Sequence, residues 1–286
     1  MRPALSALVI TFNEADQIED CLRSLEWCDE IYVVDSFSTD GTVERIRETF
    51  PAVIVEQREY LGAGAQRNWA LDRLKHDWVL AVDADERVTP QLRDEILRTL
   101  ESPQYWAYEI LRINFVYDRA VRYGGLQRDW VTRFFHRGHG RWQNKRVHAE
   151  LNVDGRKGRM KGRFLHYYIR AFDHMVEKMT RYGMWGAANQ FRRGKRGAAW
   201  KVAVHPAVRF VRDYILWGGF LDRTPGLILT GLHVYYTFWK YAKLWEFTRL
   251  ERMGKPVPLP KFDESDETWA KPWEDDDAES GSRETR

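Results

Sequence analysis

The stretch Trp78-Val-Leu-Ala-Val-Asp-Ala-Asp-Glu86 joins a continuous apolar run to a cluster of acidic residues. Such a run, bounded by polar residues, is typical of a strand that is buried on both faces of a parallel sheet. In an open sheet of parallel strands, ligands bind beyond the carboxyl ends of the strands. The stretch therefore predicts an α/β sheet with a polar site at one edge.

The first hundred residues repeat this pattern of strand and helix. Strand signals occur at residues 5–12, 30–34, 52–56 and 78–82. Helical spacing of apolar residues occurs at 14–25, at 65–74, from Pro90 to about 100, and after a cap at Thr39 or Asp40. Strands that alternate with helices predict a parallel sheet covered by helices on both faces.

Composition divides the chain into four segments. Residues 1–104 form the α/β unit, and residues 105–170 are aromatic, rich in Arg and punctuated by Gly. Residues 171–254 have amphipathic helical spacing with many Trp and Tyr. Residues 255–286 begin with alternating prolines and end in an acidic run, which is typical of a linker and a disordered tail.

The net charge of +3 conceals opposite charges in different segments of the 286-residue chain. Residues 263–286 contain ten acidic and three basic residues, so the remaining segment, with 42 basic and 32 acidic residues, carries +10. Residues 119–170 alone hold fourteen Lys/Arg against three Asp/Glu. This excess indicates an anionic partner, without distinguishing phosphate, lipid and nucleic acid.

Cysteine usage and hydropathy narrow the protein class further. The two cysteines, Cys21 and Cys28, form no zinc or disulfide framework, which favours a reducing compartment. The longest uncharged stretch, residues 224–239, is shorter than the ~20 apolar residues that cross a bilayer. We therefore expect a protein of the cytoplasm.

Polar residues follow each predicted strand. Asp83 and Asp85 lie two apart in an extended segment, so we expect their carboxylates to point the same way and to suit a hard divalent cation that also binds phosphate oxygens. A polar loop in which Asp85 or Glu86 caps the next helix is the alternative. The other strand-end residues that we assign to the site are Thr11, Asn13 and Glu14 after the first strand, and Asp35 after the second.

A Gly-rich turn precedes Arg67 and Asn68, at the start of a predicted helix. Backbone N–H groups there, together with the Arg67 guanidinium, could meet a phosphate or a base edge. The sequence contains neither the dinucleotide pattern G-x-G-x-x-G after the first strand nor the P-loop pattern. Hydride transfer and P-loop chemistry are therefore disfavoured.

Four motifs in the first hundred residues resemble a known family in order and spacing. They are Val9-Ile-Thr-Phe-Asn-Glu, Val34-Asp-Ser-x-Ser-x-Asp-Gly-Thr, Arg67-Asn and Asp83-Ala-Asp-Glu. Together they resemble the nucleotide-sugar half of the inverting glycosyltransferases of family 2, which implies a GT-A fold, with a Rossmann-like nucleotide half and a mixed acceptor half on one sheet.

Later segments resemble the lipopolysaccharide-core β-glucosyltransferase group of that family. The motifs are Asp129-Trp-x-x-Arg-Phe-Phe, Arg146-Val-His-Ala-Glu-Leu, His166-Tyr and the aromatic residues 214–246. The likeness thus spans residues 4–250. It implies transfer of a hexose, with UDP-glucose as the suggested donor, to an anionic glycolipid or lipopolysaccharide-core acceptor.

The resemblance also implies roles for residues of the first half. It places Asp35 at the uracil or ribose, Arg67 beside the base, and Asp83 at the ribose or the metal. Asp85 would bind the divalent metal, Mg²⁺ or Mn²⁺, on the pyrophosphate. His148 or His166 could complete the metal shell, although a single His is more often a hydrogen-bonded packing residue.

The base that deprotonates the acceptor hydroxyl must be a carboxylate, and Asp129 and Glu150 are the candidates. We favour Asp129, for which an ion pair with Arg128 or Arg133 is the alternative. Relatives often have Glu directly after the His of the Val-His motif, whereas here Ala149 intervenes before Glu150. A one-residue shift in a strand reverses the face of a side chain, so the position of Glu150 departs from the family pattern.

Basic and aromatic residues between 205 and 250 suit a lipid headgroup interface, although a helical layer packed on the sheet explains them equally well. We expect an enzyme that is peripheral on the cytoplasmic face of the inner membrane, with no nucleic-acid partner. A polyprenyl-phosphate glycosyltransferase is the alternative within enzymes. A non-enzymatic basic module that binds nucleic acid or lipid is the alternative from another class, and it leaves the strand-end carboxylates unexplained.

Overall fold

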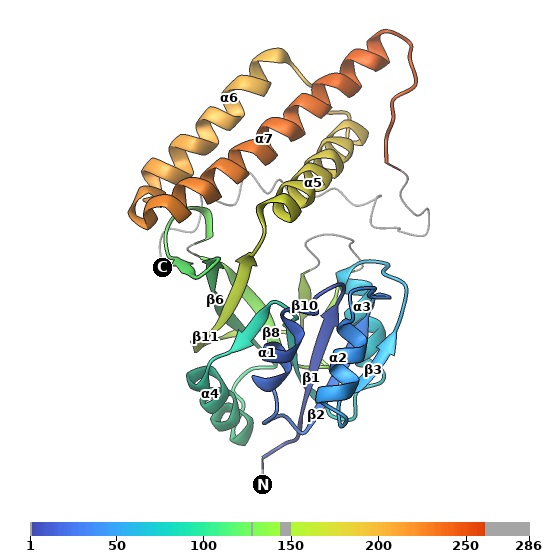
Figure 1. Cartoon of the computed structure of the whole chain (residues 1–286), viewed down its shortest axis with the longest axis vertical. Coiled ribbons are helices and arrows are strands. Elements are labelled where there is room, and N and C mark those ends of the chain that lie inside the picture. The colour runs from blue at the N-terminus through green and yellow to red at the C-terminus, as the bar shows by residue number, and fades with distance from the viewer. Residues whose placement is uncertain (1, 127, 144–149, 261–286) are drawn as a thin grey trace.

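The computed structural model describes residues 2–126, 128–143 and 150–260. It contains a mixed α/β part in the first 170 residues and a helical part after it (Figure 1). The division of the chain at residues 104, 170 and 254 stays a prediction.

One half of the main sheet is parallel, as the apolar runs predict. Strands β1 (Leu5–Thr11), β2 (Glu30–Asp35), β3 (Ile54–Gln57) and β4 (Trp78–Asp83) lie in the order β3-β2-β1-β4. The register pairs Ile10 with both Val34 and Asp83, so these three strands end side by side. Their polar carboxyl-terminal residues therefore meet at one edge of the sheet.

The other half of the sheet is mixed. Strand β8 (Trp130–His136) is antiparallel to β4 and to β6 (Ala107–Val116), and β11 (Gly158–Ile169) is parallel to β6. The short strand β5 (Glu86–Val88) closes the sheet against β11, and β7 (Arg119–Val121) pairs with β6. A separate ribbon consists of β9 (Gly140–Trp142) and β10 (Leu151–Val153), and Gly124–Leu126 forms the single turn η1.

Helices cover both faces of the parallel strands. Residues of α1 (Ile18–Arg23), α2 (Thr42–Thr49) and α4 (Pro90–Glu101) share one apolar core with alternate residues of β1 and β4. Helix α3 (Ala63–Leu71) and the β9–β10 ribbon pack on the other face with the remaining alternate residues. The alternation of side chains along each strand thus divides one apolar run between two cores.

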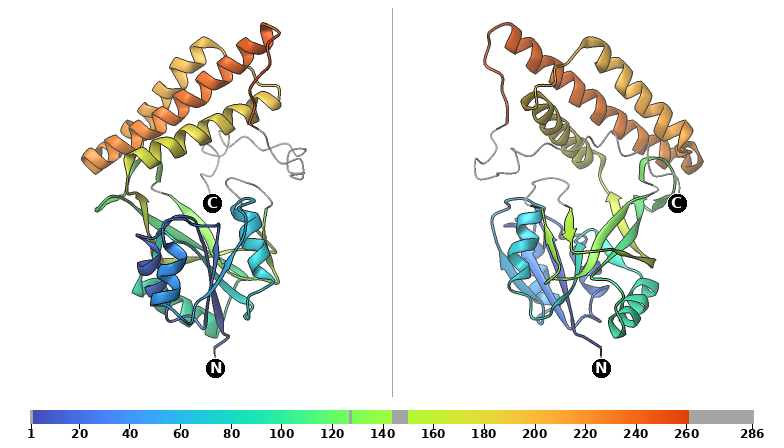
Figure 2. Two further views of the ribbon diagram at one scale, coloured as in Figure 1. Left: turned by 45° about the vertical axis from the view of Figure 1, so that its right-hand side comes forward. Right: turned by 180° about the vertical axis from the view of Figure 1, so that it is seen from behind.

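Three longer helices form a module beyond the carboxyl edge of the sheet (Figure 1; Figure 2). They are α5 (Phe172–Arg192), α6 (Ala199–Phe210) and α7 (Arg223–Arg252), and α7 packs against both of the others. A π-helical turn, η2 (Val211–Leu216), continues α6, and η3 (Gly219–Asp222) leads into α7. Apolar residues of α5 and α7 share a core with β6, β7 and β11, which fixes the module to the sheet.

The predicted elements agree with the structure in type and place, with one difference at the start of α2. Helix α2 begins after Gly41, whose φ of 88° only Gly adopts readily, and Asp40 accepts a hydrogen bond from Thr42 N at 3.1 Å. The predicted cap thus lies one residue before the helix start. In the described ranges, no helix is long and apolar enough to pass through a bilayer.

Candidate active site

The chain crosses the sheet between β4 and β5, and this crossing exposes the acidic residues. Only Ala84 and Asp85 separate the two strands, yet β4 lies next to β8 and β5 lies at the far end of the sheet against β11. The register of β5 pairs Glu86 with His166. The acidic segment therefore lies between the parallel and mixed halves, where residues from both reach it.

Asp83 is held by two arginines from different parts of the chain. Arg67 of α3 donates to Asp83 Oδ1, and Arg133 of β8 donates from Nη2 to Asp83 Oδ2 at 2.6 Å. Burial alone would raise the pKa of Asp83, but Arg133 and Arg67 outweigh it and hold the pKa below its usual range. Asp83 is therefore a fixed anion at the junction of the sheet halves.

Asp85 faces a different partner, His166, whose Nε2 lies 3.4 Å from Asp85 Oδ2. Asn114 donates from Nδ2 to Asp129 at 3.1 Å, so its Oδ1 must accept the 2.5 Å hydrogen bond from His166 Nδ1. The imidazole proton of a neutral His166 is thereby assigned to Nδ1. Nε2 and the Asp85 carboxylate are then two acceptors that need a cation between them, either a proton on Nε2 or a metal ion.

Asp129 forms a bidentate ion pair with Arg112 of the neighbouring strand. Arg112 donates from Nε and Nη2 to the two carboxylate oxygens at 2.8 and 2.7 Å, and its Nη1 lies 3.3 Å from Glu86 Oε1. Burial opposes ionisation of Asp129, but Arg112 outweighs it and lowers the pKa. The predicted alternative partners, Arg128 and Arg133, are thus wrong, because the strand pairing brings Arg112 to Asp129 instead.

The ends of β1 and β2 are joined by a hydrogen-bonded network. Asp35 is fully buried and accepts hydrogen bonds from Ser38 and, at 2.9 Å, from Gln57 Nε2. Asn13 Oδ1 accepts from Thr39 N at 2.9 Å. The buried Thr11 Oγ1 has no hydrogen-bond partner within the described ranges. This network shapes the loop after β2 and leaves one buried hydroxyl available to a ligand.

Glu14 is a partly buried carboxyl that pairs with Arg170, the first residue after β11. Burial raises the pKa of Glu14 to about 7, against the opposing effect of Arg170 and with a contribution from Asp85. The desolvation cost thus exceeds the benefit of the ion pair. Glu14 therefore links the first strand to the helical module and titrates near neutral pH.

The raised pKa predicts a pH-dependent stability for the Glu14→Gln variant. When the pKa of a carboxyl is higher in the folded than in the unfolded state, the folded protein loses stability as the pH rises. For Glu14 this loss begins at about pH 4.5 and is complete above about pH 7. Replacement by Gln removes this cost, which is at most about 3 kcal/mol. We expect the variant to melt higher than the parent at about pH 8, with the difference vanishing near pH 5.

Thermal unfolding of both proteins across this range measures the effect. Glu44→Gln, on the exposed side of α2, is the matched control and should show no such trend. A melting difference for Glu14→Gln that stays constant with pH would contradict the raised pKa.

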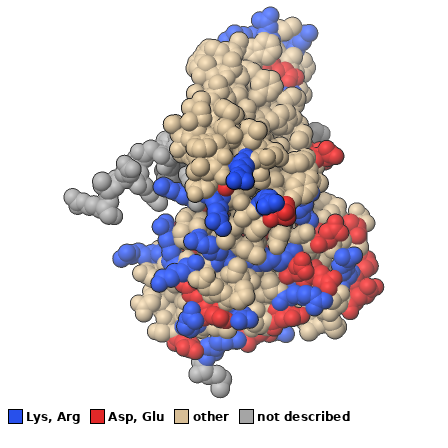
Figure 3. All heavy atoms as spheres, turned by 60° about the vertical axis from the view of Figure 1, so that its left-hand side comes forward, with Lys and Arg blue, Asp and Glu red and all other residues tan. Residues whose placement is uncertain are grey.

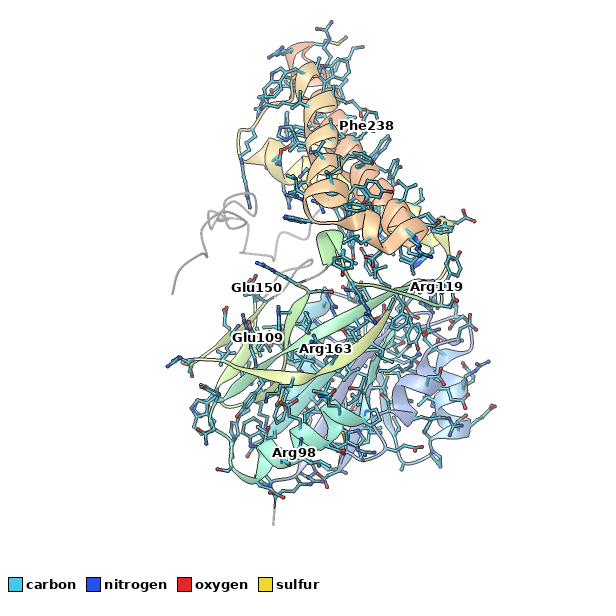
Figure 4. All side chains as sticks on the ribbon, turned by 90° about the vertical axis from the view of Figure 1, so that its left-hand side faces the viewer. Arg98, Glu109, Arg119, Glu150, Arg163 and Phe238 are labelled. Carbon is cyan, nitrogen blue, oxygen red and sulfur yellow. The ribbon has the colours of Figure 1, made fainter. Side chains whose placement is uncertain are left out.

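The remaining predicted residues lie apart from this cluster or outside the described residues. Glu150 is exposed at the start of β10, and its carbonyl accepts from Gln143 N at 2.9 Å. In Figure 4 Glu150 and Arg119 lie at opposite sides of the upper edge of the sheet, below the helices. His148 lies outside the described residues. Asn68 bonds through its amide to the backbone of Trp142, so it positions the β9–β10 ribbon.

Sequence reasoning missed three polar residues that the fold brings to the acidic segment. These are Arg112 and Asn114 of β6, and Arg170 after β11. Arg112 and Asn114 are two apart, so they share one face of β6, which is a signal that a period-two reading of that strand could have used. Arg133, within the Asp129-Trp-x-x-Arg motif, was considered only as a partner of Asp129, whereas the structure pairs it with Asp83.

Two groups of atoms could hold ligands. Within the described ranges, no three His, Cys, Asp or Glu side chains form a ready metal site, and Asp85 and His166 are a pair of possible ligands there. A carboxylate oxygen and an unprotonated imidazole nitrogen are a suitable pair of donors for Mn²⁺, and phosphate oxygens could complete the shell. The buried Nε atoms of Arg67 and Arg133 have no hydrogen-bond partner in the same ranges, which leaves donors for an anion.

Curated proteins that are similar to this chain are described as glycosyltransferases. The lipopolysaccharide core biosynthesis glycosyltransferase LpsC of Rhizobium meliloti (strain 1021) is 28% identical over 255 residues, which cover 85% of this chain and 92% of LpsC. A Rickettsia prowazekii (strain Madrid E) protein described as an uncharacterized glycosyltransferase is 27% identical over 84% of this chain and 86% of its own.

Solved structures of glycosyltransferases are also similar over most of the chain. Staphylococcus aureus TarS 1-349 in complex with UDP has a TM-score of 0.46 and 15% identity, covering 91% of this chain and 94% of that one. The mannosyltransferase PcManGT from Pyrobaculum calidifontis, in complex with GDP-Man and Mn²⁺, has a TM-score of 0.46 and 17% identity, covering 86% and 88%.

The family profile described as Glycosyl transferase family 2 matches residues 6–158. This range is more than half of the chain. It includes the parallel strands, the acidic segment and the Asp129–Arg112 pair. The chain is a glycosyltransferase with a mixed α/β GT-A-like fold, and it belongs to glycosyl transferase family 2.

Proposed function

We propose that this enzyme is an inverting glycosyltransferase that moves a hexose, with glucose as the first candidate, from a nucleoside diphosphate sugar to an anionic glycolipid such as a lipopolysaccharide core. The observation that carries the proposal is the acidic segment Asp83-Ala-Asp85, held between Arg67, Arg133 and His166 at the carboxyl edge of the sheet. This edge contains both carboxylates and arginine N–H donors that have no partner within the described residues. Such an edge suits a ligand that carries phosphates and a metal ion.

Several buried atoms support a nucleotide-sugar donor at this edge. Thr11 Oγ1, Arg67 Nε and Arg133 Nε are buried polar atoms without partners within the described residues. A buried polar atom without a partner costs roughly 1–3 kcal/mol, and a bound polar ligand can offset that cost. Asp35, at the neighbouring strand end, is the proposed contact to the uracil or ribose, and Asn13 and Glu14 line the same edge.

Asp85 and His166 are the proposed metal-binding residues, with His148 as a candidate outside the described residues. The metal ion, Mg²⁺ or Mn²⁺, would supply positive charge for the departing diphosphate. Asn114 orients the His166 ring, and Asp83 is already neutralised by Arg67 and Arg133. Asp85 is therefore the carboxylate that remains available to a cation.

The reaction exchanges one bond for another at the anomeric carbon. The acceptor oxygen forms a bond to that carbon while the bond to the diphosphate oxygen breaks, and the leaving diphosphate takes the electron pair. The hydroxyl proton moves to a carboxylate on the acceptor side. Asp129 is the proposed base, because Asn114 and His166 connect it to Asp85 by contacts of 3.1, 2.5 and 3.4 Å. Glu150 is the alternative.

The acceptor is proposed to be anionic because fourteen Lys/Arg lie between residues 119 and 170, against three acids. Ion pairs inside the site use Arg112, Arg133 and Arg170, but Arg122, Arg128 and Arg163 remain on or near the surface. These cations suit phosphate or carboxylate groups on a glycolipid. We place the enzyme at the cytoplasmic face of the inner membrane, where nucleotide sugars and lipid acceptors meet.

A screen of donor hydrolysis tests the reaction. UDP-, GDP- and dTDP-hexoses are incubated with the full-length protein and Mn²⁺ or Mg²⁺, and the released nucleotide is measured. We expect release from one nucleotide class and stimulation by the metal. Addition of a polyprenyl phosphate or a lipopolysaccharide-core acceptor then separates the two acceptor classes. No release from any donor with either metal and either acceptor would contradict the proposal.

Binding of the donor nucleotide should raise the melting temperature. At one hundred times its dissociation constant, a ligand stabilises the fold by about 2.7 kcal/mol. For a chain of this length that corresponds to a rise of roughly 5 to 10 °C. We expect this rise with UDP and Mn²⁺, and none with DNA or RNA. A rise with nucleic acid alone would instead favour the non-enzymatic module.

A further inference from the structure

The outer face of α6 and η2 is entirely apolar. Residues 199–216 are all described, and every side chain of this segment that is exposed is apolar. The large ones recur at helical spacing and define what we call the apolar stripe: Trp200, Val204, Val208, Val211, Ile215 and Leu216. Leu216, at 72% exposure, is the most exposed large apolar side chain among the described residues. A contiguous exposed apolar surface of this kind marks an interaction site.

The polar groups of the same segment are turned inward. Asp213 is buried and accepts hydrogen bonds from Arg209 Nε at 2.6 Å and from Arg212 Nε at 2.9 Å, and His233 Nδ1 of α7 lies 3.3 Å away. Asp213 is the buried residue of η2, and Pro206 is the buried residue of α6. This distribution is the reverse of that on a water-facing helix, where charged side chains cover the outer face. The ion pairs of Asp213 hold this side of the segment against the module, so the apolar stripe faces outward.

The charge around the stripe selects the partner. Residues 171–255, which are all described, contain fifteen Lys/Arg and six Asp/Glu, a net charge of +9. Docking two copies through this module would bring like charges together, whereas an anionic lipid surface would neutralise them. Figure 3 shows a largely uncharged surface over the helical part, with Lys and Arg at its top and base. Trp200 lies beside Lys201, a pairing that suits a headgroup boundary.

We propose that the apolar stripe docks on the surface of an anionic lipid bilayer, with α6 and η2 lying in the interface rather than crossing it. The segment of 18 residues is about 27 Å long, which is sufficient for a stable interfacial helix. Phe220 and Leu221, half exposed in the next turn, extend the apolar surface toward α7. This docking element deepens the proposed function and rests on its lipid-linked acceptor.

The distance between the stripe and the sheet differs along the stripe. At the α6 end, α7 lies between α6 and α5, and α5 is the helix nearest the sheet (Figure 2). At the other end, η2 contacts η1, which follows β7, and Gly124 N donates to the carbonyl of Trp217 at 3.0 Å. The stripe is therefore nearest to the sheet at its η2 end.

Vesicle flotation with the full-length protein tests the proposal. Phosphatidylcholine vesicles with and without phosphatidylglycerol are compared for the parent, for Val208→Asp in the stripe, and for Val176→Asp on α5. Val208 is 58% exposed and Val176 is 40% exposed, so the two variants make the same charge change at exposed helical positions. We expect the parent and Val176→Asp to bind vesicles containing phosphatidylglycerol, and Val208→Asp to bind roughly tenfold more weakly.

The outcomes separate this inference from the proposed reaction. Nucleotide release from the donor, measured without vesicles, should be equal in all three proteins, so membrane docking and donor chemistry can fail independently. Absence of parent binding to any vesicle, or equal binding by Val208→Asp, would overturn the inference. So would a parent dimer that Val208→Asp converts to a monomer without any vesicle binding, since the stripe would then be an interface between copies.

Discussion

Replacement of Asp85 by Ala is expected to lower sugar transfer by about a thousandfold or more, while the fold is retained. Asp83 is already neutralised by Arg67 and Arg133, so Asp85 is the carboxylate of the acidic segment that we propose to hold the metal ion. Without Asp85, the charge of the departing diphosphate would not be compensated, which would cost several kcal/mol in the transition state. Steady-state transfer with saturating Mn²⁺ measures the effect.

Stability and binding measurements separate this loss from unfolding. The Asp85 side chain is 22% exposed, and burial opposes its ionisation while His166 lowers its pKa. Its removal should therefore change the free energy of unfolding by about 1 kcal/mol or less. Asp118→Ala, at the highly exposed turn after β6, is the matched control and should transfer sugar normally. Full transfer by Asp85→Ala in metal-free buffer would refute the assignment of Asp85.

The same site explains which parts of the fold could be predicted from sequence. Local patterns sufficed for the parallel strands, because each is a continuous apolar run that ends in polar residues. The rule that parallel strands bind ligands at their carboxyl ends then located Asp35, Asp83 and Asp85 at one edge. The sequence patterns did not predict that Asp83 and Asp85 have different partners. These partners, Arg133 and His166, come from strands far along the chain.

The mixed half of the sheet was not predictable in the same way. Strand β5 follows β4 after two residues but pairs with β11, eighty residues later, and no local signal encodes that crossing. The partner of Asp129 is a further example. Neighbours in sequence suggested Arg128 or Arg133, but the antiparallel pairing of β6 and β8 places Leu111 opposite Trp130, and so brings Arg112 to Asp129.

Helical spacing alone also left the role of residues 171–254 open. It predicts helices and an apolar face, but it does not tell which face is buried when a helix packs at the edge of a module. In the segment formed by α6 and η2, the ion pairs of Asp213 lie inside and three valines lie outside, and only the packing against α7 reveals this. A membrane-facing helix and a buried one thus have similar sequences and different environments.

The Asp129→Asn variant is expected to lower turnover by about a thousandfold, and Glu150→Gln to leave it near normal. Burial opposes ionisation of Asp129, but Arg112 outweighs it and holds the pKa of Asp129 below its usual range, so the proposed base is ionised at neutral pH in the parent. The Asn variant has no base, and its residual turnover should therefore rise with pH as hydroxide takes over. The pH profiles of kcat for the three proteins measure this.

Loss of the ion pair must be distinguished from loss of the base. Asp129→Asn leaves Arg112 with Glu86 as its remaining anionic neighbour, which we expect to cost about 3 kcal/mol of stability. A purely structural role would lower stability and turnover but leave the shape of the pH profile unchanged. If both variants keep near-normal turnover with unchanged pH dependence, neither carboxylate is the base. If Glu150→Gln instead gains the hydroxide-dependent rise, the base is Glu150, and Asp129 serves to hold Arg112 and Asn114 beside the metal-binding residues.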